Sequence, residues 1–352
     1  MNIVVVGGGA VGSFLANVLA ASGASVTLVR RRAQGDAGPQ PVGNQGDGRP
    51  RGALTVVSRL DQSGDKPDLV VVAVKAFDLA SAVTDLPDWP STTLLTVQNG
   101  VGSEEVVHAG RPNNPVVAGS LTASVELAPE GEVRRRRRGG IGLAQVAGQG
   151  LAIRDLVTSF NAGGLSARAY PNWRAMKWSK LIANLVGNAT SALVDMPVGD
   201  VYAYPGLFEI ERTQLREAFE VVRALGLKPV SLPGADVPRL ELGLALPAPV
   251  GRTILGLVVG GGRGGKDPSL RIALSAKSPR TEIAWLNGAV VEHGRGAHVD
   301  TPVNRALTDL VERVSIDDEL RERLRGRPDR LVDAVDEYRS VGTGPDLRAA
   351  SR

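Results

Sequence analysis

The residues with the clearest chemical meaning lie near the start of the chain, in the segment Gly7-Gly8-Gly9-Ala10-Val11-Gly12. They fit the pattern G-x-G-x-x-G, whose glycines permit a tight turn, a close approach of the backbone to a pyrophosphate, and close packing of a helix on a strand. The free N–H groups of the following helix attract phosphate oxygens. The pattern predicts dinucleotide binding by Gly7, Gly9, Ala10, Val11 and Gly12, with a glycine turn that binds no cofactor as the alternative.

Three arginines, Arg30-Arg31-Arg32, follow the second expected strand. An NAD-binding unit normally has Asp or Glu there, which accepts hydrogen bonds from the ribose hydroxyls. Guanidinium groups instead suit a 2′-phosphate, which they bind through paired, charge-assisted hydrogen bonds. We therefore predict NADPH as the cofactor and Arg31 as one of its ligands, with a solvated basic strand end as the alternative.

Polar residues also follow two further expected strands. Lys75 comes after the apolar run 69–74, and Asn99 lies in Gln98-Asn99-Gly100 after the run 93–97. Ligands of open parallel sheets collect beyond the carboxyl ends of the strands, so both residues are predicted to border the cofactor. Taken alone, each is also explained as a solvent-facing strand cap or an ordinary turn residue.

A lysine and two asparagines recur at intervals of four residues: Lys180, Asn184 and Asn188. On a continuous helix this spacing places one cation and two amides on one face. An inward-facing polar stripe and a solvated one fit the spacing equally well. Further on, Glu282 lies where the first turn of another helix is expected, and attraction to the helix dipole is enough to explain it.

The apolar pattern supplies the scaffold for these residues. Short apolar runs predict the strands of a parallel, doubly wound sheet that ends near residue 165, at 3–6, 25–29, 54–57, 69–74, 93–97 and 116–120. Apolar residues three and four apart predict helices at 173–193, 207–225, 282–293 and 301–314. Residues 33–52 are expected to form a mobile loop, and residues 228–267 to interrupt the helical pattern.

The predicted fold class is therefore α/β, with a Rossmann-type doubly wound sheet domain followed by a mainly α-helical domain. The sheet domain is expected at residues 1–168, the helical domain at 169–340, and a flexible tail at 341–352.

Composition excludes several other classes. The chain has 352 residues, enough for two domains, and its 43% hydrophobic and 22% charged residues are ordinary for a globular protein. Because it has no cysteine, disulfides, thiolate metal sites and thiol nucleophiles are excluded, and its three scattered histidines predict no metal site. We see no signal peptide or membrane span, and expect a cytoplasmic protein with no membrane partner.

Two conspicuous segments predict no separate function. The run from Arg134 to Arg138 has no interleaved aromatic residues, so a solvated hairpin edge is expected and no nucleic-acid partner. Residues 260–267 nearly match a P-loop, but Asp267 stands where Ser or Thr must bind magnesium. A flexible lid over the substrate is expected there instead.

In their order and spacing these motifs resemble the ketopantoate reductase family, also called 2-dehydropantoate 2-reductases, across nearly the whole chain. The resemblance rests on five segments: Gly7 to Gly12 with Arg31, Lys75, Gln98-Asn99-Gly100, the helix from Trp178 to Asn188, and Thr281-Glu282-Ile283 with Asn287-Gly288. It implies NADPH-dependent reduction of a small 2-oxoacid, first of all ketopantoate to pantoate in pantothenate and coenzyme A biosynthesis. The site is expected in the cleft between the domains of a monomer or homodimer.

The resemblance also implies roles for individual residues. Lys180 donates a proton to the carbonyl oxygen as hydride arrives, and Glu282 binds a substrate hydroxyl and orients the lysine. Asn99, Asn184 and Asn188 hold the cofactor and substrate. Ser269 is the candidate for binding the substrate carboxylate, although its segment lacks the family's Ser-Met-x-x-Asp pattern and lies one residue further from Glu282.

That departure leaves the exact 2-oxoacid open. A reductase of another 2-oxoacid and an opine-type dehydrogenase are the alternative enzymes. A non-catalytic NADP(H) sensor is the alternative from another class, but a sensor has no use for Lys180 and Glu282 together.

Overall fold

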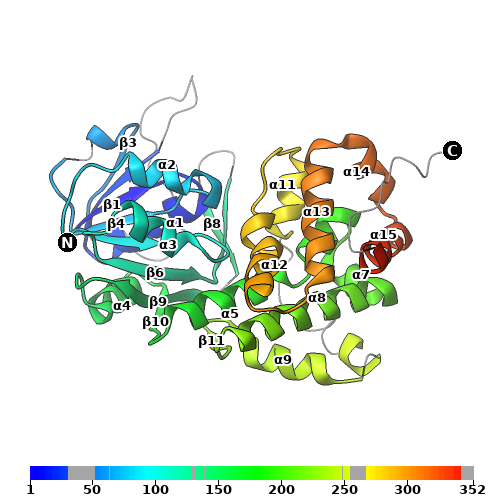
Figure 1. The fold of residues 1–352 in the computed structure, drawn as a ribbon. Coiled ribbons are helices and arrows are strands. Elements are labelled where there is room, and N and C mark those ends of the chain that lie inside the picture. Colours follow the sequence, from blue (N-terminus) through cyan, green and yellow to red (C-terminus); the bar gives the residue numbers. More distant parts are fainter. Residues whose placement is uncertain are drawn as a thin grey trace. The chain divides into compact units, whose positions relative to one another are not determined.

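The computed structural model describes residues 1–30, 52–62, 64–128, 132–137, 139–247, 249–253 and 267–341. The chain forms two compact units (Figure 1). One, the sheet unit, holds Met1–Lys180 and Ser231–Asp236, and the other, the helical unit, holds Leu181–Val230 and Val237–Arg352. The expected domain limits at 168 and 340 stay predictions, and the expected loop at 33–52 and tail at 341–352 lie almost wholly outside the described residues.

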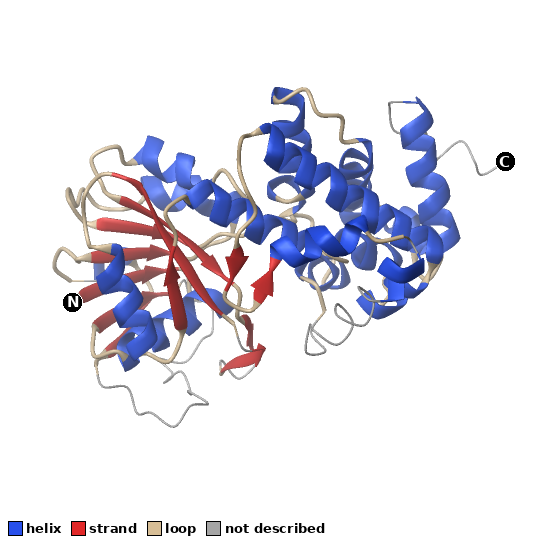
Figure 2. Cartoon of the chain, turned by 90° about the horizontal axis from the view of Figure 1, so that it is seen from below, coloured by secondary structure: helices blue, strands red, loops and turns tan. Residues whose placement is uncertain are grey.

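The sheet unit is built on an eight-stranded sheet in the order β10-β9-β6-β5-β4-β1-β2-β3 (Figures 1 and 2). Its neighbouring strands are parallel except β6 and β9, which are antiparallel. The strands are β1 (Asn2–Val6), β2 (Ser25–Val29), β3 (Leu54–Val57), β4 (Leu69–Val72), β5 (Thr93–Thr96), β6 (Val116–Leu121), β9 (Gly140–Ala147) and β10 (Ser166–Ala169). The order reverses at β1 and β4, as in a doubly wound sheet, and the predicted fold class is confirmed.

Helices cover both faces of this sheet, and two short hairpins complete the unit. The helices are α1 (Ala10–Ala21), η1 (Leu60–Gln62), η2 (Ala76–Asp78), α2 (Leu79–Thr84), α3 (Ser103–Gly110), α4 (Ile153–Ala162) and α5 (Trp173–Leu185), which continues into the helical unit. The hairpins pair β7 (Ser124–Leu127) with β8 (Val133–Arg137) and β11 (Ser231–Leu232) with β12 (Ala235–Asp236).

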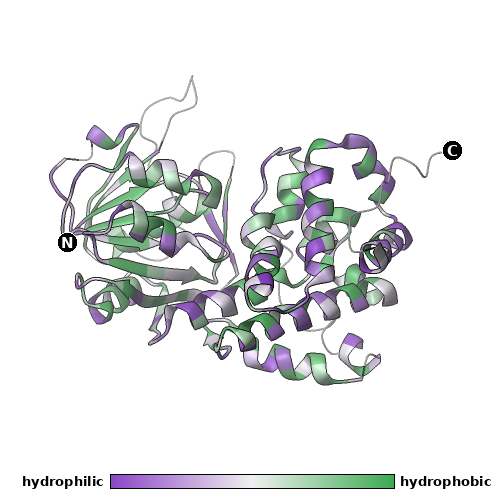
Figure 3. Ribbon diagram, viewed as in Figure 1, coloured by the Kyte–Doolittle hydropathy of each residue, from purple (hydrophilic) through white to green (hydrophobic). Residues whose placement is uncertain are grey.

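Apolar side chains fill the space on each face of the sheet, and Figure 3 shows the hydrophobic residues along its strands. Ile3 and Val5 of β1 point into one core with Phe14 of α1, whereas Val4 points into the opposite core with Leu79 of α2. Successive residues of a strand face opposite sides, so a strand buried on both sides reads as a continuous apolar run. This explains why the sequence predicts these strands.

Two strands of the eight-stranded sheet, β9 and β10, lie outside the predicted set. β9 reads Gly-Ile-Gly-Leu-Ala, and its small residues give no strong apolar signal. They are needed because the sheet is crowded here: a Cβ on Gly142 would lie 2.7 Å from the sulfur of Met176. With β10 beside β9, the sheet continues to Ala169 instead of ending near residue 165. Residues 134–137 of the arginine run lie in β8 of a hairpin, as predicted, and Arg136 pairs there with Glu126 at 2.8 Å. Val125 and Val133 of the same hairpin are buried.

The helical unit consists of helices packed around α8 and α13. Its elements are α6 (Ala189–Val194), α7 (Val198–Ala203), α8 (Pro205–Ala224), α9 (Val237–Ala245), α11 (Ser269–Ser275), η3 (Ile283–Trp285), α12 (Asn287–Gly296), α13 (Pro302–Ile316), α14 (Asp318–Leu324) and α15 (Pro328–Val341). α13 packs against α6, α8, α12 and α15. The predicted helices at 207–225 and 301–314 are confirmed by α8 and α13. No helix in the described ranges has the length and apolar character needed to cross a membrane.

The prediction that residues 228–267 interrupt the helical pattern is wrong for part of that segment. α9 lies within it and packs on α8, with Val237 and Leu244 buried seven residues apart on one face. The glycine-rich residues 254–266, which include most of the expected lid, lie outside the described residues.

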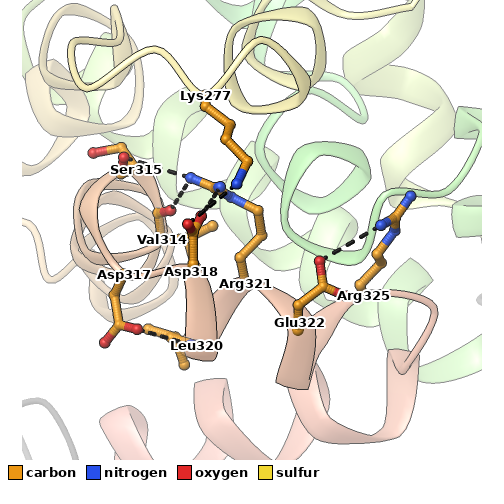
Figure 4. A network of polar contacts seen from close by, with 9 residues as sticks. All are labelled: Lys277, Val314, Ser315, Asp317, Asp318, Leu320, Arg321, Glu322 and Arg325. Atoms are coloured by element: carbon orange, nitrogen blue, oxygen red, sulfur yellow. Dashed lines mark hydrogen bonds and ion pairs between the residues drawn. The ribbon is translucent and has the colours of Figure 1, made fainter.

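Polar contacts hold the corner between α13 and α14 (Figure 4). Asp317 caps α14, because its Oδ1 accepts a hydrogen bond from the backbone N–H of Leu320 at 3.0 Å. Arg321 pairs with Asp318, and the Nζ of Lys277 lies 3.1 Å from the same carboxylate. Lys277 and Asp318 are both mostly exposed, so their pair contributes about 0–1 kcal/mol to stability.

Candidate active site

The glycine-rich segment forms a tight loop between β1 and α1. Gly7 has a φ of +116°, which favours glycine, and a Cβ there would lie 2.7 Å from the carbonyl oxygen of Ala73. A Cβ on Gly12 would overlap the carbonyl oxygen of Gly7, so this glycine lets α1 begin close to β1. At Gly9, no described atom lies within 4 Å of the Cβ position. The loop is therefore open where the pattern requires a phosphate to approach, and these residues fit a dinucleotide.

The residue after β2 lies against this loop. A Cβ on Gly8 would overlap the side chain of Arg30, and the N–H of Arg30 donates to the carbonyl oxygen of Val57 at 2.9 Å. Arg31 and Arg32 lie outside the described residues. The assignment of Arg31 to a 2′-phosphate therefore stays a prediction.

Lys75 and Asn99 lie at the same edge of the sheet as the glycine loop. Lys75 is exposed between β4 and η2, and Asn99 is half-buried after β5. Gln98 joins the two strand ends, because its Nε2 donates to the carbonyl oxygens of Val72 at 2.8 Å and Val74 at 3.1 Å. Since β1, β4 and β5 are parallel neighbours, their carboxyl ends bring both residues to the edge that carries the loop, as predicted.

Lys180 and Asn184 lie one turn apart on α5, and both are half-buried. The prediction of one helix over 173–193 is wrong, because α5 ends at Leu185 and α6 begins only at Ala189. Gly187 lies between them with a φ of +59°, a conformation that a right-handed helix does not contain. Asn188 precedes α6 and so does not continue the face that carries Lys180 and Asn184.

A buried carboxylate holds this break in place. Glu211 of α8 is fully buried, and its Oε2 accepts a hydrogen bond from the backbone N–H of Gly187 at 2.6 Å. Its Oε1 accepts one from the hydroxyl of Thr190 in α6 at 2.6 Å. Glu211 was not predicted from the sequence, where its only local signal is a charged residue on the apolar face of a helix.

The structure brings Asn188 and Ser269 together within the helical unit. The Oδ1 of buried Asn188 accepts a hydrogen bond from the backbone N–H of Leu270 at 3.1 Å. Ser269, the preceding residue, begins α11 and is exposed. The two predicted substrate ligands are therefore neighbours despite their distance in sequence.

Glu282 is 6% exposed and precedes the short turn η3. The prediction of a helix over 282–293 is wrong at its start, since the backbone turns at Leu286, with φ −107° and ψ −99°, and α12 begins at Asn287. Glu282 is thus not in the first turn of an α-helix. Asn287 anchors this segment, as its Nδ2 donates to Gln214 at 2.8 Å and to Asn304 at 3.0 Å.

By unit, Lys75, Asn99 and Lys180 belong to the sheet unit with the glycine loop. Four other predicted site residues belong to the helical unit: Asn184, Asn188, Ser269 and Glu282. The assembly of these residues into one site stays a prediction.

One cluster in the sheet unit was not identified from the sequence. Lys177 of α5 is 1% exposed, and its Nζ lies 3.0 Å from Oε1 of Glu104, which is fully buried in the first turn of α3. The same Nζ donates to the carbonyl oxygen of Gln98 at 2.7 Å. The hydroxyl of Thr96 donates to Oε1 of Glu104 at 2.7 Å. The sequence signal that could have indicated this buried lysine is its position between two large apolar residues, Met176 and Trp178, both of which are buried.

Comparison with known proteins identifies relatives along most of the chain. The family described as "Ketopantoate reductase PanE/ApbA" matches residues 3–148, and its C-terminal part matches residues 172–315. The 2-dehydropantoate 2-reductase of Halobacterium salinarum is 31% identical over 322 residues, which cover 88% of this chain and 98% of that protein.

Solved structures share the fold. A PanE/ApbA family ketopantoate reductase from Ralstonia eutropha JMP134 is 24% identical with a TM-score of 0.68, covering 91% of this chain and 99% of the other. A D-mandelate dehydrogenase solved with NADH and anilino(oxo)acetate is 22% identical with a TM-score of 0.73, at the same coverage.

Proposed function

The chain belongs to the ketopantoate reductase family and is an oxidoreductase, and from this premise we propose that it reduces the ketone of a 2-oxoacid with NADPH. The preferred substrate is 2-dehydropantoate, which is reduced to pantoate for pantothenate and coenzyme A biosynthesis. One observation carries the proposal: within the sheet unit, the helix with Lys180 is bonded through Lys177 to the turn with Asn99, beside the open glycine loop.

The cofactor is assigned to residues at the carboxyl edge of the sheet. Gly7 to Gly12 take the pyrophosphate, since Gly9 leaves room for it and α1 begins there. Arg31 takes the 2′-phosphate, while Lys75 and Asn99 border the nicotinamide half. When bound, NADPH supplies the hydride.

Lys180 is the proton donor. The substrate's carbonyl carbon receives the hydride, and its oxygen takes a proton from Nζ of Lys180, so the ketone becomes a secondary alcohol. Lys180 is left as a neutral amine, which solvent protonates again. Before the proton moves, its ammonium group stabilises the negative charge that develops on the oxygen. The half-buried position suits both tasks, because it strengthens the electrostatic interaction and keeps access to water.

The substrate is assigned to polar residues of the helical unit. Ser269 binds its carboxylate, and Asn184 and Asn188 donate to its oxygen atoms. Because Oδ1 of Asn188 already accepts the bond from Leu270, the Nδ2 of that residue is its donor to substrate. Glu282 accepts a hydrogen bond from a substrate hydroxyl, and its burial strengthens this contact.

A second candidate is reduction of another 2-oxoacid. The segment from Ser269 lacks the Ser-Met-x-x-Asp pattern, and the fold also serves a protein named D-mandelate dehydrogenase. The opine-type alternative has no structural observation in its favour.

Initial rates of NADPH oxidation with a panel of 2-oxoacids test the proposal. The panel contains ketopantoate, 2-oxo-2-phenylacetate, and pyruvate with and without an amino acid, each repeated with NADH. We expect the highest kcat/KM for ketopantoate with NADPH. A higher kcat/KM for another acid would favour the second candidate, a reductase of that acid. NADPH binding without turnover on any acid would contradict both enzymes and favour the non-catalytic sensor.

A further inference from the structure

We propose that Lys177 is a positioning residue that fixes the turn carrying Asn99 and ties it to the helix carrying Lys180. The inference rests on the proposed function, because it assigns Asn99 to the nicotinamide and Lys180 to the substrate carbonyl. Both elements belong to the sheet unit.

The contact acts on the peptide that precedes Asn99. The Nζ of Lys177 donates to the carbonyl oxygen of Gln98 at 2.7 Å, and that carbonyl shares its peptide plane with the N–H of Asn99. Fixing the carbonyl therefore fixes the direction in which the chain enters Asn99.

The turn needs such a restraint because glycines make it permissive. Gly100 has a φ of +84° and Gly102 a φ of +97°, and residues without a Cβ adopt several conformations at similar cost. The side chain of Gln98 holds the near side of the turn to β4. Lys177 holds the same residue from the side of α5, so Gln98 is fixed by contacts from two elements.

A chain of buried contacts fixes Lys177 in turn. Its partner Glu104 is fully buried, and the hydroxyl of Thr96 donates to the carboxylate oxygen that Lys177 also contacts. Thr96 ends β5 and Glu104 lies in the first turn of α3, so the bond between Thr96 and Glu104 joins the two ends of the turn. A buried ion pair is often no more stabilising than apolar side chains of equal volume. The role that distinguishes Lys177 from an apolar residue is therefore the hydrogen bond to Gln98.

Lys177 also lies three residues before Lys180, on the adjacent turn of α5. A displacement of Lys177 is thus transmitted to Lys180 through a single helical turn. The hydrogen bond therefore fixes the position of Lys180, the proposed proton donor, relative to Asn99, the proposed nicotinamide contact.

The test compares Glu104→Gln with the double variant Lys177→Met/Glu104→Gln. Both lack the buried carboxylate and differ only at residue 177, where Lys can donate to Gln98 and Met cannot. Because Glu104→Gln keeps an oxygen that can accept from Lys177 and Thr96, we expect its kcat for ketopantoate to stay within about threefold of the wild type. The double variant should lose about tenfold or more in kcat, because a misplaced turn misaligns the reacting atoms. It should keep its NADPH Kd within about threefold, and show a larger isotope effect with NADPH deuterated at the transferred position.

Arg111→Met is the matched control for loss of a cation that donates to backbone carbonyls in the same unit. Arg111 follows α3 and donates to the carbonyls of Val83 and Thr84, both at 3.1 Å. It should lower the unfolding temperature and leave kcat and the isotope effect unchanged.

Equal kcat in the two Glu104 variants would overturn the proposal and leave the ion pair a purely structural role. If the double variant does not fold, Lys177→Met/Glu104→Met decides, because it replaces the pair with two apolar side chains and leaves no unpaired buried charge. The same loss of kcat at unchanged NADPH Kd is expected, and an unchanged kcat would overturn the proposal. If the wild type turns over no 2-oxoacid, the proposed function is wrong, but the positioning role of Lys177 can still be tested. The fluorescence of bound NADPH is then compared between Glu104→Gln and the double variant: a difference in emission at equal Kd supports that role, and identical emission contradicts it.

Discussion

In the sheet unit, the residues assigned to the cofactor follow strands whose parallel pairing fixes their positions. The register of β1 with β4 and of β4 with β5 is enough to bring the glycine loop, Lys75 and Asn99 to one edge. In the helical unit, the residues assigned to the substrate lie beside irregular helix ends, before α6, at the start of α11 and before α12. Buried polar side chains fix those ends. Strand pairing thus brings the cofactor residues to one edge, where Gln98 and Lys177 only fix the turn of Asn99, while side-chain contacts alone position the substrate residues.

The polar interior of the helical unit is a connected series of hydrogen bonds. Gln214 donates to Glu211 at 2.6 Å and accepts from Asn287 at 2.8 Å. Asn304 then contacts Asn287 at 3.0 Å and donates to Glu217 at 2.7 Å. All five side chains are buried. The series joins the break before Asn188 to the segment that carries Glu282.

The largest expected effect is that of Glu211→Ala. The change leaves the N–H of Gly187 and the hydroxyls of Thr190 and Tyr202 without their acceptor in a buried place. We expect the free energy of unfolding to fall by about 3–5 kcal/mol, measured by urea denaturation. KM for the 2-oxoacid should rise, because the segment before Asn188 loses its support, while folded protein still binds NADPH.

Glu209→Ala on the same helix is the control. Glu209 is mostly exposed and lies 3.6 Å from Arg212, so its loss should cost less than about 1 kcal/mol. Similar costs for the two variants would contradict the role of Glu211 in fixing the break at Gly187.

Two glycines of the cofactor loop should respond differently to alanine. Gly12→Ala forces a Cβ onto the carbonyl of Gly7 and should lower the free energy of unfolding by about 1–3 kcal/mol. At Gly9, no described atom lies near the Cβ position and φ is −75°, so Gly9→Ala should change the free energy of unfolding by less than about 1 kcal/mol. NADPH affinity should nevertheless fall by about tenfold or more, because the methyl group fills the approach to the pyrophosphate. Wild-type affinity in Gly9→Ala would contradict the assigned cofactor site.

Arg31→Asp tests the choice of cofactor. Loss of the charge-assisted bonds to the 2′-phosphate should lower the preference for NADPH over NADH by about 10- to 100-fold in kcat/KM. Arg154→Asp changes the net charge by the same amount at an exposed position on α4, and should not change the ratio of kcat/KM with NADPH to kcat/KM with NADH. An unchanged ratio in Arg31→Asp would mean that Arg30 to Arg32 form a solvated strand end that binds no 2′-phosphate.

The smallest effect concerns pH and the interior of the helical unit. Burial raises the pKa of Glu217 above its ordinary value of 4.5, although hydrogen bonds from Asn304 and Val303 oppose the rise. The folded protein therefore keeps this proton to higher pH than the unfolded chain. The resulting stabilisation is present below pH 4.5 and is lost as pH rises through the folded pKa, with a slope of at most about 1.4 kcal/mol per pH unit. Glu217→Gln should remove this slope from the denaturation series, and an unaltered slope would mean that another group causes it.

The same comparison explains how much the sequence predicts. The strands before residue 121, the glycine loop, Lys75 and Asn99 follow from the sequence, because apolar runs and chain direction decide them. The break at Gly187 does not follow from the local sequence, because Glu211, which stabilises it, lies 24 residues away. The contact between Asn188 and Leu270 likewise spans 82 residues. Lys177 could not be assigned from the sequence because its partners Glu104 and Gln98 come from elements distant in sequence, and its apolar neighbours indicate burial but no partner.

The most direct test of Lys180 as the proton donor is single-turnover NADPH oxidation with ketopantoate by wild-type protein and by Lys180→Ala. We expect the rate to fall by about 10³-fold in the variant, because the proposed proton donor is lost. Its NADPH Kd should stay close to that of the wild type, since the glycine loop is intact. Turnover at the wild-type rate in Lys180→Ala would remove this residue from proton donation and contradict the account.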